Sequence, residues 1–265
     1  MSGTMARLVP NLLTIALSGR ASSRAFAAAF KLCGRRLERR WPFIPNASGK
    51  DLNLGFDDVL EFQRARSSEF VALVVGAYDG VANDPASEFI RSYVHKAVFV
   101  EPQPRPFKRL QASMQGCPGV NLLNAAVDEA SSIRQFFTVP SGIAGLPAWT
   151  EQLGSFDRDH LLKHEDRAPG LSQHIVTLNV PTLSFADLLE QFAITRLDLL
   201  QIDAEGMDAK LLGWFPFHRM KPTIVYYENA HMSSSEHEAV RARLRAMGYT
   251  FCEQPDSLDD IALQF

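Results

Sequence analysis

Four carboxylates in this sequence each follow a short apolar run that is typical of a buried strand. Glu101 follows KAVFV, Asp203 and Glu205 follow LDLLQI, and Glu228 follows TIVYY. Ligands of open α/β sheets bind outside the carboxyl ends of the strands, so we expect these side chains to gather around one pocket. A carboxylate can accept hydrogen bonds from ribose hydroxyls or take a proton from an alcohol. The predicted chemistry is therefore nucleoside binding beside proton transfer.

The stretch FVALVVGAYDGVANDP supplies the turn that such a pocket needs. Val71–Val75 is too short for a typical helix and rich in β-branched residues, so we predict a strand that is covered on both faces. Gly76 and Gly80 then fall in the following turn, where glycine permits positive φ and the close approach of a ligand. A helix is predicted behind the turn, with Asp84 as its cap and Pro85 at its first position.

The spacing of the two glycines indicates which kind of ligand the turn holds. GxxxG lacks the close glycine pair of the GxGxxG dinucleotide motif, which favours a nucleoside without a pyrophosphate. Glu101 lies 25 residues after Gly76, where a carboxylate can accept hydrogen bonds from both ribose hydroxyls. The alternative for Glu101 is a solvated charge at the end of a strand.

Asp203, Glu205, Glu228 and His231 are the candidate catalytic residues. An alcohol is a poor nucleophile until its proton leaves, and a base within hydrogen-bond reach accelerates the reaction by about 10²- to 10⁴-fold. We expect Asp203 or Glu205 near the acceptor, with Glu228 and His231 framing the pocket. The alternatives are that the first two cap a helix beginning near Met207 and that His231 lies exposed at a helix entrance.

The sequence predicts no metal site. His160 and His164 lie one helical turn apart, but no HExxH motif and no nearby cysteine pair accompany them. A divalent ion shared by Asp203 and Glu228 is conceivable. The three cysteines share no metal-type spacing, which favours a reduced, cytoplasmic protein, and no apolar run is long enough to cross a membrane.

Residues 1–50 differ in charge from the rest of the chain. They hold nine Lys and Arg residues and a single acidic residue, Glu38, which leaves the remainder clearly acidic. Phe26, Phe30, Cys33, Leu37 and Trp41 fall on one stripe of a predicted helix. Within residues 20–41, this helix could contact a membrane surface or a partner, or it could cover its own domain. A transit peptide also fits the composition, although no clear cleavage site follows.

From Phe70 onward, strands alternate with helices in the manner of an open, mostly parallel α/β sheet. Further strands are predicted at KAVFVEP, GVNLLNAAV, IRQFFTV, HIVTLNV, LDLLQID, PTIVYYE, YTFCEQ and DIALQF, with helices at 104–115, 184–192, near Met207 and at 233–247. Residues 140–172 are rich in glycine and proline, and we predict that they form a lid or substrate loop. The domains expected are a basic, helical extension over 1–50 and one catalytic domain over 51–265.

Five segments carry a resemblance to a known family. LVVGAYDGVANDP, VFVEPQP, NLLNAAV, PTLSFADLLEQFAITRLDLLQIDAEGMDAKLL and PTIVYYENAHMS occur in this order, and together they resemble the FkbM family of S-adenosylmethionine-dependent methyltransferases. The resemblance implies a class I methyltransferase (Rossmann-like) fold: a seven-stranded, mostly parallel sheet with an antiparallel last strand. It also implies methylation of a hydroxyl on a sugar, glycolipid or polyketide-type natural product, with a small-molecule or glycan acceptor and no nucleic acid partner.

The resemblance also implies roles for individual residues. Those expected at the S-adenosylmethionine site are Gly76, Ala77, Tyr78, Asp79 and Gly80 for the methionine part, Glu101 for the ribose, Asn124, Ala125, Ala126 and Val127 for the adenine, and also Pro102 and Asp203. The chain departs from the family pattern in three places: Val74 stands where Asp is common, Tyr78 where Asn is common, and Gln201 where Lys is common.

Two other functions would use a similar pocket. A nicotinamide-dependent oxidoreductase would also place Glu101 on a ribose, but it should show GxGxxG and a proton donor. A noncatalytic binding protein with a decayed cofactor site is the second alternative, since Val74 and Tyr78 replace common family residues.

Overall fold

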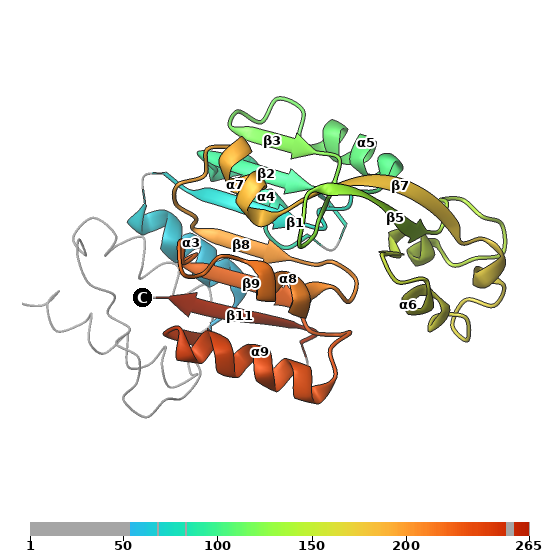
Figure 1. Ribbon diagram of the computed structural model, residues 1–265. Helices are drawn as coiled ribbons and strands as arrows, with labels where there is room; N and C mark the ends of the chain where they lie inside the picture. Colours follow the sequence, from blue (N-terminus) through green and yellow to red (C-terminus); the bar gives the residue numbers. More distant parts are fainter. Residues whose placement is uncertain (1–53, 68, 83, 253–256, 265) are drawn as a thin grey trace, which may run out of the picture.

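A computed structural model describes residues 54–67, 69–82, 84–252 and 257–264 (Figure 1). The predictions made for residues 1–50 lie outside this range. Within it, the chain forms two sheets: one seven-stranded sheet in the order β10-β11-β9-β8-β1-β2-β3, and one four-stranded sheet in the order β4-β7-β5-β6. No helix in the described part of the chain is both long and apolar enough to span a bilayer.

The seven-stranded sheet confirms the predicted fold. Its strands are β1 (Val71–Val75), β2 (Lys96–Val100), β3 (Val120–Leu123), β8 (Leu199–Ile202), β9 (Ile224–Glu228), β10 (Tyr249–Cys252) and β11 (Asp259–Gln264). β1 pairs in parallel with β2 and β8, and β8 pairs in parallel with β9. Only β11, the last strand, is antiparallel to its neighbours β9 and β10.

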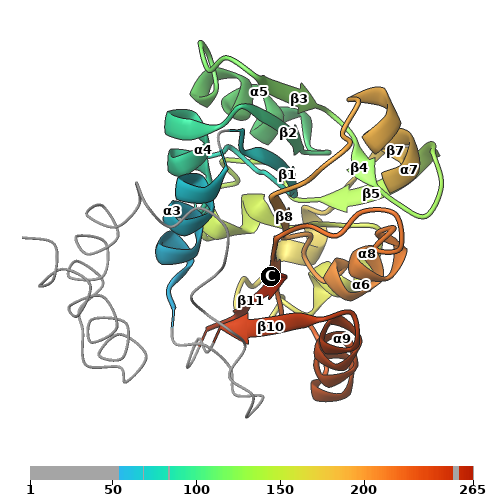
Figure 2. The same ribbon diagram turned by 90° about the vertical axis from the view of Figure 1, so that its left-hand side faces the viewer.

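Helices cover both faces of this sheet (Figure 2). The helices are α3 (Phe56–Arg66), α4 (Ser87–Tyr93), α5 (Pro104–Ser113), α7 (Phe185–Gln191), α8 (Asp208–Trp214) and α9 (Ser234–Ala246). Side chains of α3, α4 and α5 belong to one apolar cluster, and those of α7, α8 and α9 belong to another. Successive residues of β1 alternate between the two clusters because side chains of a strand point to opposite faces. This is why β1 is apolar throughout.

The helix behind the glycine turn begins later than predicted. α4 starts at Ser87, so Pro85 lies before the helix and not at its first position. Asp84 is likewise not the cap, because the N-cap residue is Ala86. The Asp84 carboxylate still accepts hydrogen bonds from the backbone N–H groups of Ala86 and Ser87, each at 3.1 Å.

The four-stranded sheet corrects the prediction of a single sheet. It contains β4 (Ala126–Val127), β5 (Ser132–Thr138), β6 (Gly154–Ser155) and β7 (Val176–Leu183), with β5 antiparallel to β7. The predicted third strand, GVNLLNAAV, is therefore split between the two sheets. The physical reason is burial: the first four residues of β5 are exposed, whereas parallel strands of a central sheet are covered on both faces.

The predicted loop at residues 140–172 contains short elements of its own. They are η1 (Ala148–Gln152), β6, α6 (Arg158–Leu162) and η2 (Leu171–Gln173). Val139, Leu153, Leu161, Ala168 and Leu171 form a small separate core beneath them. Figure 1 shows α6 beyond the carboxyl ends of the seven-stranded sheet, so this segment lies on the side where the predicted pocket opens.

Candidate active site

A cavity of about 640 Å³ lies at the carboxyl ends of β1, β2, β8 and β9, with residues of β4, β5 and β6 on its other side. It joins the glycine turn, the end of β2 and the carboxylates after β8 and β9, as predicted from the ends of these strands. Its lining includes Gly76, Ala77, Tyr78, Glu101, Pro102, Ala125, Ala126, Val127, Gln201, Asp203, Glu205 and Glu228.

The two glycines of the turn serve different purposes. Gly76 has φ +80, and a Cβ there would lie 1.6 Å from the backbone oxygen of Asp203. Gly80 has φ +66, but a Cβ there would meet side chains of Leu110 and Met114. Gly76 therefore allows the exits of β1 and β8 to touch beside the cavity, whereas Gly80 allows the turn to pack on α5. Gly80 does not line the cavity.

Glu101 is held at the end of β2 with capacity for a ligand. Its side chain is 3% exposed, and its two oxygens accept hydrogen bonds from the N–H groups of Tyr78 at 2.9 Å and Gln103 at 2.7 Å. Burial raises the pKa of Glu101 to about 8, although these two amides act in the opposite direction. Since a carboxylate has about four acceptor sites, each oxygen can still accept from one ribose hydroxyl.

Two other predicted cofactor residues differ from their expected placement. Asn124 is not among the residues that line the cavity; its amide donates to the carbonyls of Glu101 and Pro102. Asp79 also lies outside the lining, because its carboxylate accepts from the N–H groups of Val81 and Ala82 within the turn. Both side chains therefore shape the site through the backbone.

Tyr78 links the glycine turn to the segment that carries α6. It lines the cavity and has φ +46, an uncommon value for a residue other than glycine. Its hydroxyl donates to Glu151 at 2.7 Å and accepts from Arg109 at 2.6 Å. Glu151 belongs to η1 and Arg109 to α5, so one phenol joins three elements around the cavity.

The carboxylates after β8 and β9 form an acidic end of the cavity. Burial raises the pKa of Asp203 to about 8, with further contributions from Asp208 and Glu205. Burial and the charge of Asp203 raise the pKa of Glu228 to about 9. Within the described residues, one oxygen of Glu228 is buried without a hydrogen-bond partner. Crowded carboxylates of this kind favour a positively charged ligand.

The helix-capping alternative for Asp203 and Glu205 is not what the structure shows. In the part of the chain that is described, neither side chain accepts a hydrogen bond from a backbone N–H of α8. The N-cap residue of α8 is Met207, and no side-chain hydrogen bond caps the helix there. Asp208 instead accepts from the N–H of Ala204 at 3.2 Å. Both carboxylates are therefore free to face the cavity that they line.

Gln201, one of the departures from the family pattern, lies on the cavity wall. Its amide nitrogen donates to Asp84 at 3.2 Å. Among the described residues, its buried amide oxygen has no hydrogen-bond partner. Val74, another departure, is fully buried in the core cluster with Ala77 and Ala86, so no polar group reaches the cavity from that position.

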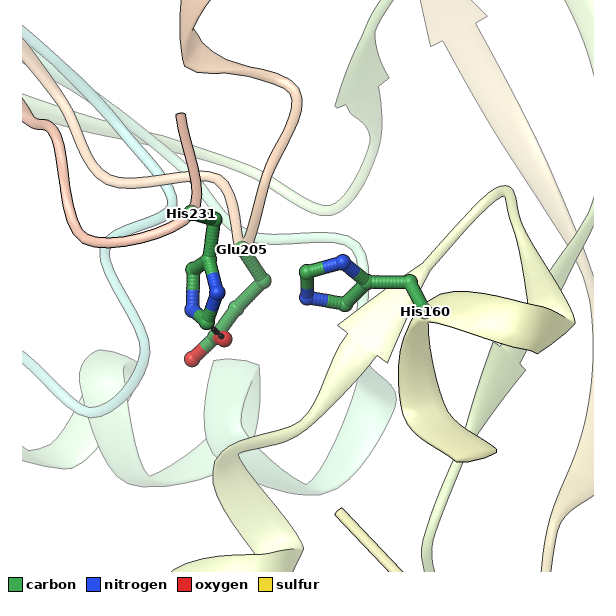
Figure 3. A group of neighbouring side chains, drawn as sticks. All are labelled: His160, Glu205 and His231. Atoms are coloured by element: carbon green, nitrogen blue, oxygen red, sulfur yellow. Dashed lines mark ion pairs between the residues drawn. The ribbon is translucent and has the colours of Figure 1, made fainter. Parts of the chain in front are cut away.

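His231 lies beside the acidic end, where it meets a histidine that the sequence did not place there. His231 Nε2 is 3.3 Å from Glu205 and 3.8 Å from Glu228. His160 belongs to α6, and the centroid of its ring lies 4.6 Å from the centroid of the His231 ring (Figure 3). Burial, followed by the nearby His231, lowers the pKa of His160 to about 4. The sequence places His160 and His164 one helical turn apart, but no sequence pattern indicates that both lie near His231.

The strand order of the seven-stranded sheet is that of the class I methyltransferase fold. Residues 75–251 match the family model described as the methyltransferase FkbM domain. The chain therefore belongs to the FkbM methyltransferase family, whose members use S-adenosylmethionine, and this family assignment disfavours the nicotinamide-dependent oxidoreductase.

Solved structures with a similar arrangement include methyltransferases of several kinds. One is the methyltransferase FkbM from Methylobacillus flagellatus, with 13% identity and a TM-score of 0.47 over 99% of this chain and 60% of that one. Another is a methyltransferase from Geobacter sulfurreducens, with 13% identity and a TM-score of 0.41 over 100% and 99%. This chain thus spans less than two thirds of the first protein. No curated protein matches the sequence.

The residues present fit S-adenosylmethionine. Gly76 lies on the cavity wall with no side chain of its own, and Glu101 retains acceptor sites for the ribose hydroxyls. Ala125, Ala126 and Val127 offer small apolar surfaces on the cavity wall for the adenine. The acidic end, at Asp203 and Glu228, suits the positive charges of the cofactor.

Proposed function

We propose that this protein transfers the methyl group of S-adenosylmethionine to a hydroxyl oxygen of a sugar, glycolipid or polyketide-type natural product. The observation that carries the proposal is one cavity lined at once by the glycine turn, Glu101 and three carboxylates, Asp203, Glu205 and Glu228. The first two features suit a nucleoside, and the carboxylates suit an acceptor that must lose a proton.

When bound, S-adenosylmethionine supplies an electrophilic methyl group on a positive sulfonium. The protein then has to align an acceptor oxygen with that group, and such alignment is worth roughly 7–11 kcal/mol. Glu101 fixes the ribose through its two oxygens, which are themselves fixed by the N–H groups of Tyr78 and Gln103. The walls of the cavity fix the acceptor and exclude water.

Asp203 or Glu205 is the proton acceptor in this proposal. Both line the cavity where the chain leaves β8, whereas Glu101 lies at the end of β2 and is occupied by two amides. A carboxylate in hydrogen-bond reach of the hydroxyl would take its proton as the new C–O bond forms. Glu228 and His231 frame this end of the cavity from β9 and the turn that follows it.

Apolar side chains at the cavity support an acceptor that is apolar in part. Val81 and Leu258 line the cavity and are each 63% exposed. Phe136 of β5 and Phe156, which follows β6, also line it. Their rings contact edge-to-face with centroids 5.3 Å apart. Exposed apolar side chains at a pocket are typical of ligand-binding grooves, and this combination suits a glycolipid or a polyketide better than a free sugar.

Calorimetry followed by a methyl-transfer assay tests the proposal. The full chain should bind S-adenosylhomocysteine and should not bind NAD. It should then transfer labelled methyl to a member of a panel of hydroxylated glycolipids, sugars and polyketides, with the label stable to base as expected of an ether. Binding of S-adenosylhomocysteine without transfer to any acceptor would favour the noncatalytic alternative, and label lost in base would indicate an ester.

A further inference from the structure

Three metal-binding side chains from distant parts of the chain meet beside the cavity. They are His160 from α6, Glu205 from the turn after β8, and His231 from the turn after β9. One potential ligand atom from each lies within 4.8 Å of the others, and within the described residues this is a group able to hold a metal ion. Figure 3 shows the outer edge of the His160 ring turned toward the other two.

His160 provides a second and independent sign of a ligand. Its side chain is 7% exposed, yet in the part of the chain described here its Nε2 atom has no hydrogen-bond partner. A buried polar atom without a partner destabilises the fold unless a ligand occupies it. The turn after β8 makes room for this ring, because a Cβ at Gly206 would lie 2.7 Å from it.

We propose that His160, Glu205 and His231 bind one divalent transition-metal ion. Two imidazoles and one carboxylate form the ligand set of several zinc and non-haem iron sites that keep positions open for substrate. Imidazole is a ligand for zinc, copper, iron and nickel, whereas magnesium and calcium prefer oxygen. The donor set therefore selects an ion of the Zn²⁺ or Fe²⁺ kind.

The geometry needs only a small adjustment to close around an ion. Metal–nitrogen and metal–oxygen bonds of about 2.0–2.2 Å place neighbouring ligand atoms about 3–3.5 Å apart. His231 Nε2 and Glu205 already lie 3.3 Å apart, so the main movement is an approach of His160.

The open positions of this ion would face the cavity, because Glu205 is also a cavity-lining residue. On the proposed function, they would hold the acceptor hydroxyl and lower its pKa. Glu205 would then be a metal ligand, which leaves Asp203 as the proton acceptor. The ion would also fasten α6 to the ends of β8 and β9.

Cobalt(II) titration of the full chain, without a histidine tag, tests the site directly. Co²⁺ should bind with a stoichiometry of one and give a visible absorption band, and Zn²⁺ should displace it. His160→Ala, His160→Gln and His231→Ala should each weaken Co²⁺ binding by more than about tenfold. His218→Ala, which removes an exposed histidine outside the cluster, should leave it unchanged.

Circular dichroism and S-adenosylhomocysteine affinity should be preserved in His160→Gln, which shows that any loss of the band is not a loss of fold. Absence of a one-to-one cobalt band in the unaltered protein, or an equal band in the His160 and His231 variants, would overturn the proposal. The titration needs no acceptor, so it fails or succeeds independently of the methyl-transfer assay.

Discussion

The two ends of the cavity are built in different ways. The end with Gly76 and Glu101 comes from the adjacent strands β1 and β2. The Glu101 carboxylate is held there by backbone N–H groups from the turns that follow these two strands. The end with Glu205 and His231 gathers side chains from the exits of β8 and β9 and from α6. The first end is a rigid cradle suited to a constant cofactor, and the second is an assembly that can vary with the acceptor.

The largest predicted effect is a loss of stability at Gly76, where the backbone of Asp203 lies closest. Gly76→Ala should destabilise the protein by about 3 kcal/mol or more, because it combines the cost of positive φ, about 1–2 kcal/mol, with overlap between its Cβ and Asp203. Gly116→Ala is the matched control: φ is also +80, but a Cβ meets nothing within 4 Å. Denaturant unfolding should show the difference, and equal losses would contradict the close contact.

The carboxylates proposed as the catalytic base should affect the rate of methyl transfer much more than cofactor binding. Asp203→Asn or Glu205→Gln should lower the rate of methyl transfer by about 10²-fold or more, while S-adenosylhomocysteine affinity stays nearly intact. Single-turnover assays and calorimetry on both variants measure this separation. Full turnover in both variants would remove the general-base assignment from this end of the cavity.

Glu101→Gln should have the opposite character. Above about pH 8, where Glu101 is ionised, losing charge-assisted hydrogen bonds to the ribose costs about 1.5–3 kcal/mol. S-adenosylhomocysteine should then bind at least tenfold more weakly while the fold is retained. Glu88→Gln, on the exposed side of α4, serves as the control in the same calorimetry. Unchanged affinity in Glu101→Gln would exclude this carboxylate from the cofactor site.

The pH dependence of nucleoside binding should be the smallest effect and can sharpen the assignment of Glu101. Its pKa of about 8 lies above the ordinary 4.5, so the side chain is protonated at pH 6 and becomes a full acceptor above pH 8. Affinity for 5′-methylthioadenosine, which lacks the titrating amino group of the cofactor, should rise through pH 8 and then level off. In Glu101→Gln, the profile should be flat.

The same pKa shift has a defined effect on folding. Between about pH 4.5 and 8, the folded protein retains a proton on Glu101 that the unfolded chain has lost. The contribution of this group to stability is therefore fully present below pH 4.5 and falls as the pH rises toward 8. Glu101→Gln should reduce the loss of melting temperature over that interval.

The cradle was predictable from the sequence because its signals are local. Val71–Val75 is uniformly apolar and ends at a glycine, and Glu101 closes the next such strand. The family resemblance, which rests on short motifs in a fixed order, predicted the antiparallel last strand. In each case, a short stretch of sequence contains both the strand and the residue that the strand positions.

The other end could be predicted only in part. Asp203, Glu205 and Glu228 could be predicted because each follows a strand, but the proximity of His160 to Glu205 depends on where α6 lies. That position depends on β5 and β7, which read as members of one open sheet and instead pair with each other outside it. Asn124 and Asp79 were predicted to contact the ligand, but their side chains instead form hydrogen bonds with backbone groups. No sequence pattern reveals these backbone partners.

The pairing of β5 with β7 also bears on how this enzyme can diversify. Thr138 at the end of β5 pairs with Val176 at the start of β7, so the intervening segment leaves and rejoins the scaffold at one point. Changing the length of an inserted segment between fixed ends costs little conformational entropy. Evolution can therefore exchange this segment as a unit, replacing one wall of the cavity while the strand ends that form the opposite wall are inherited unchanged.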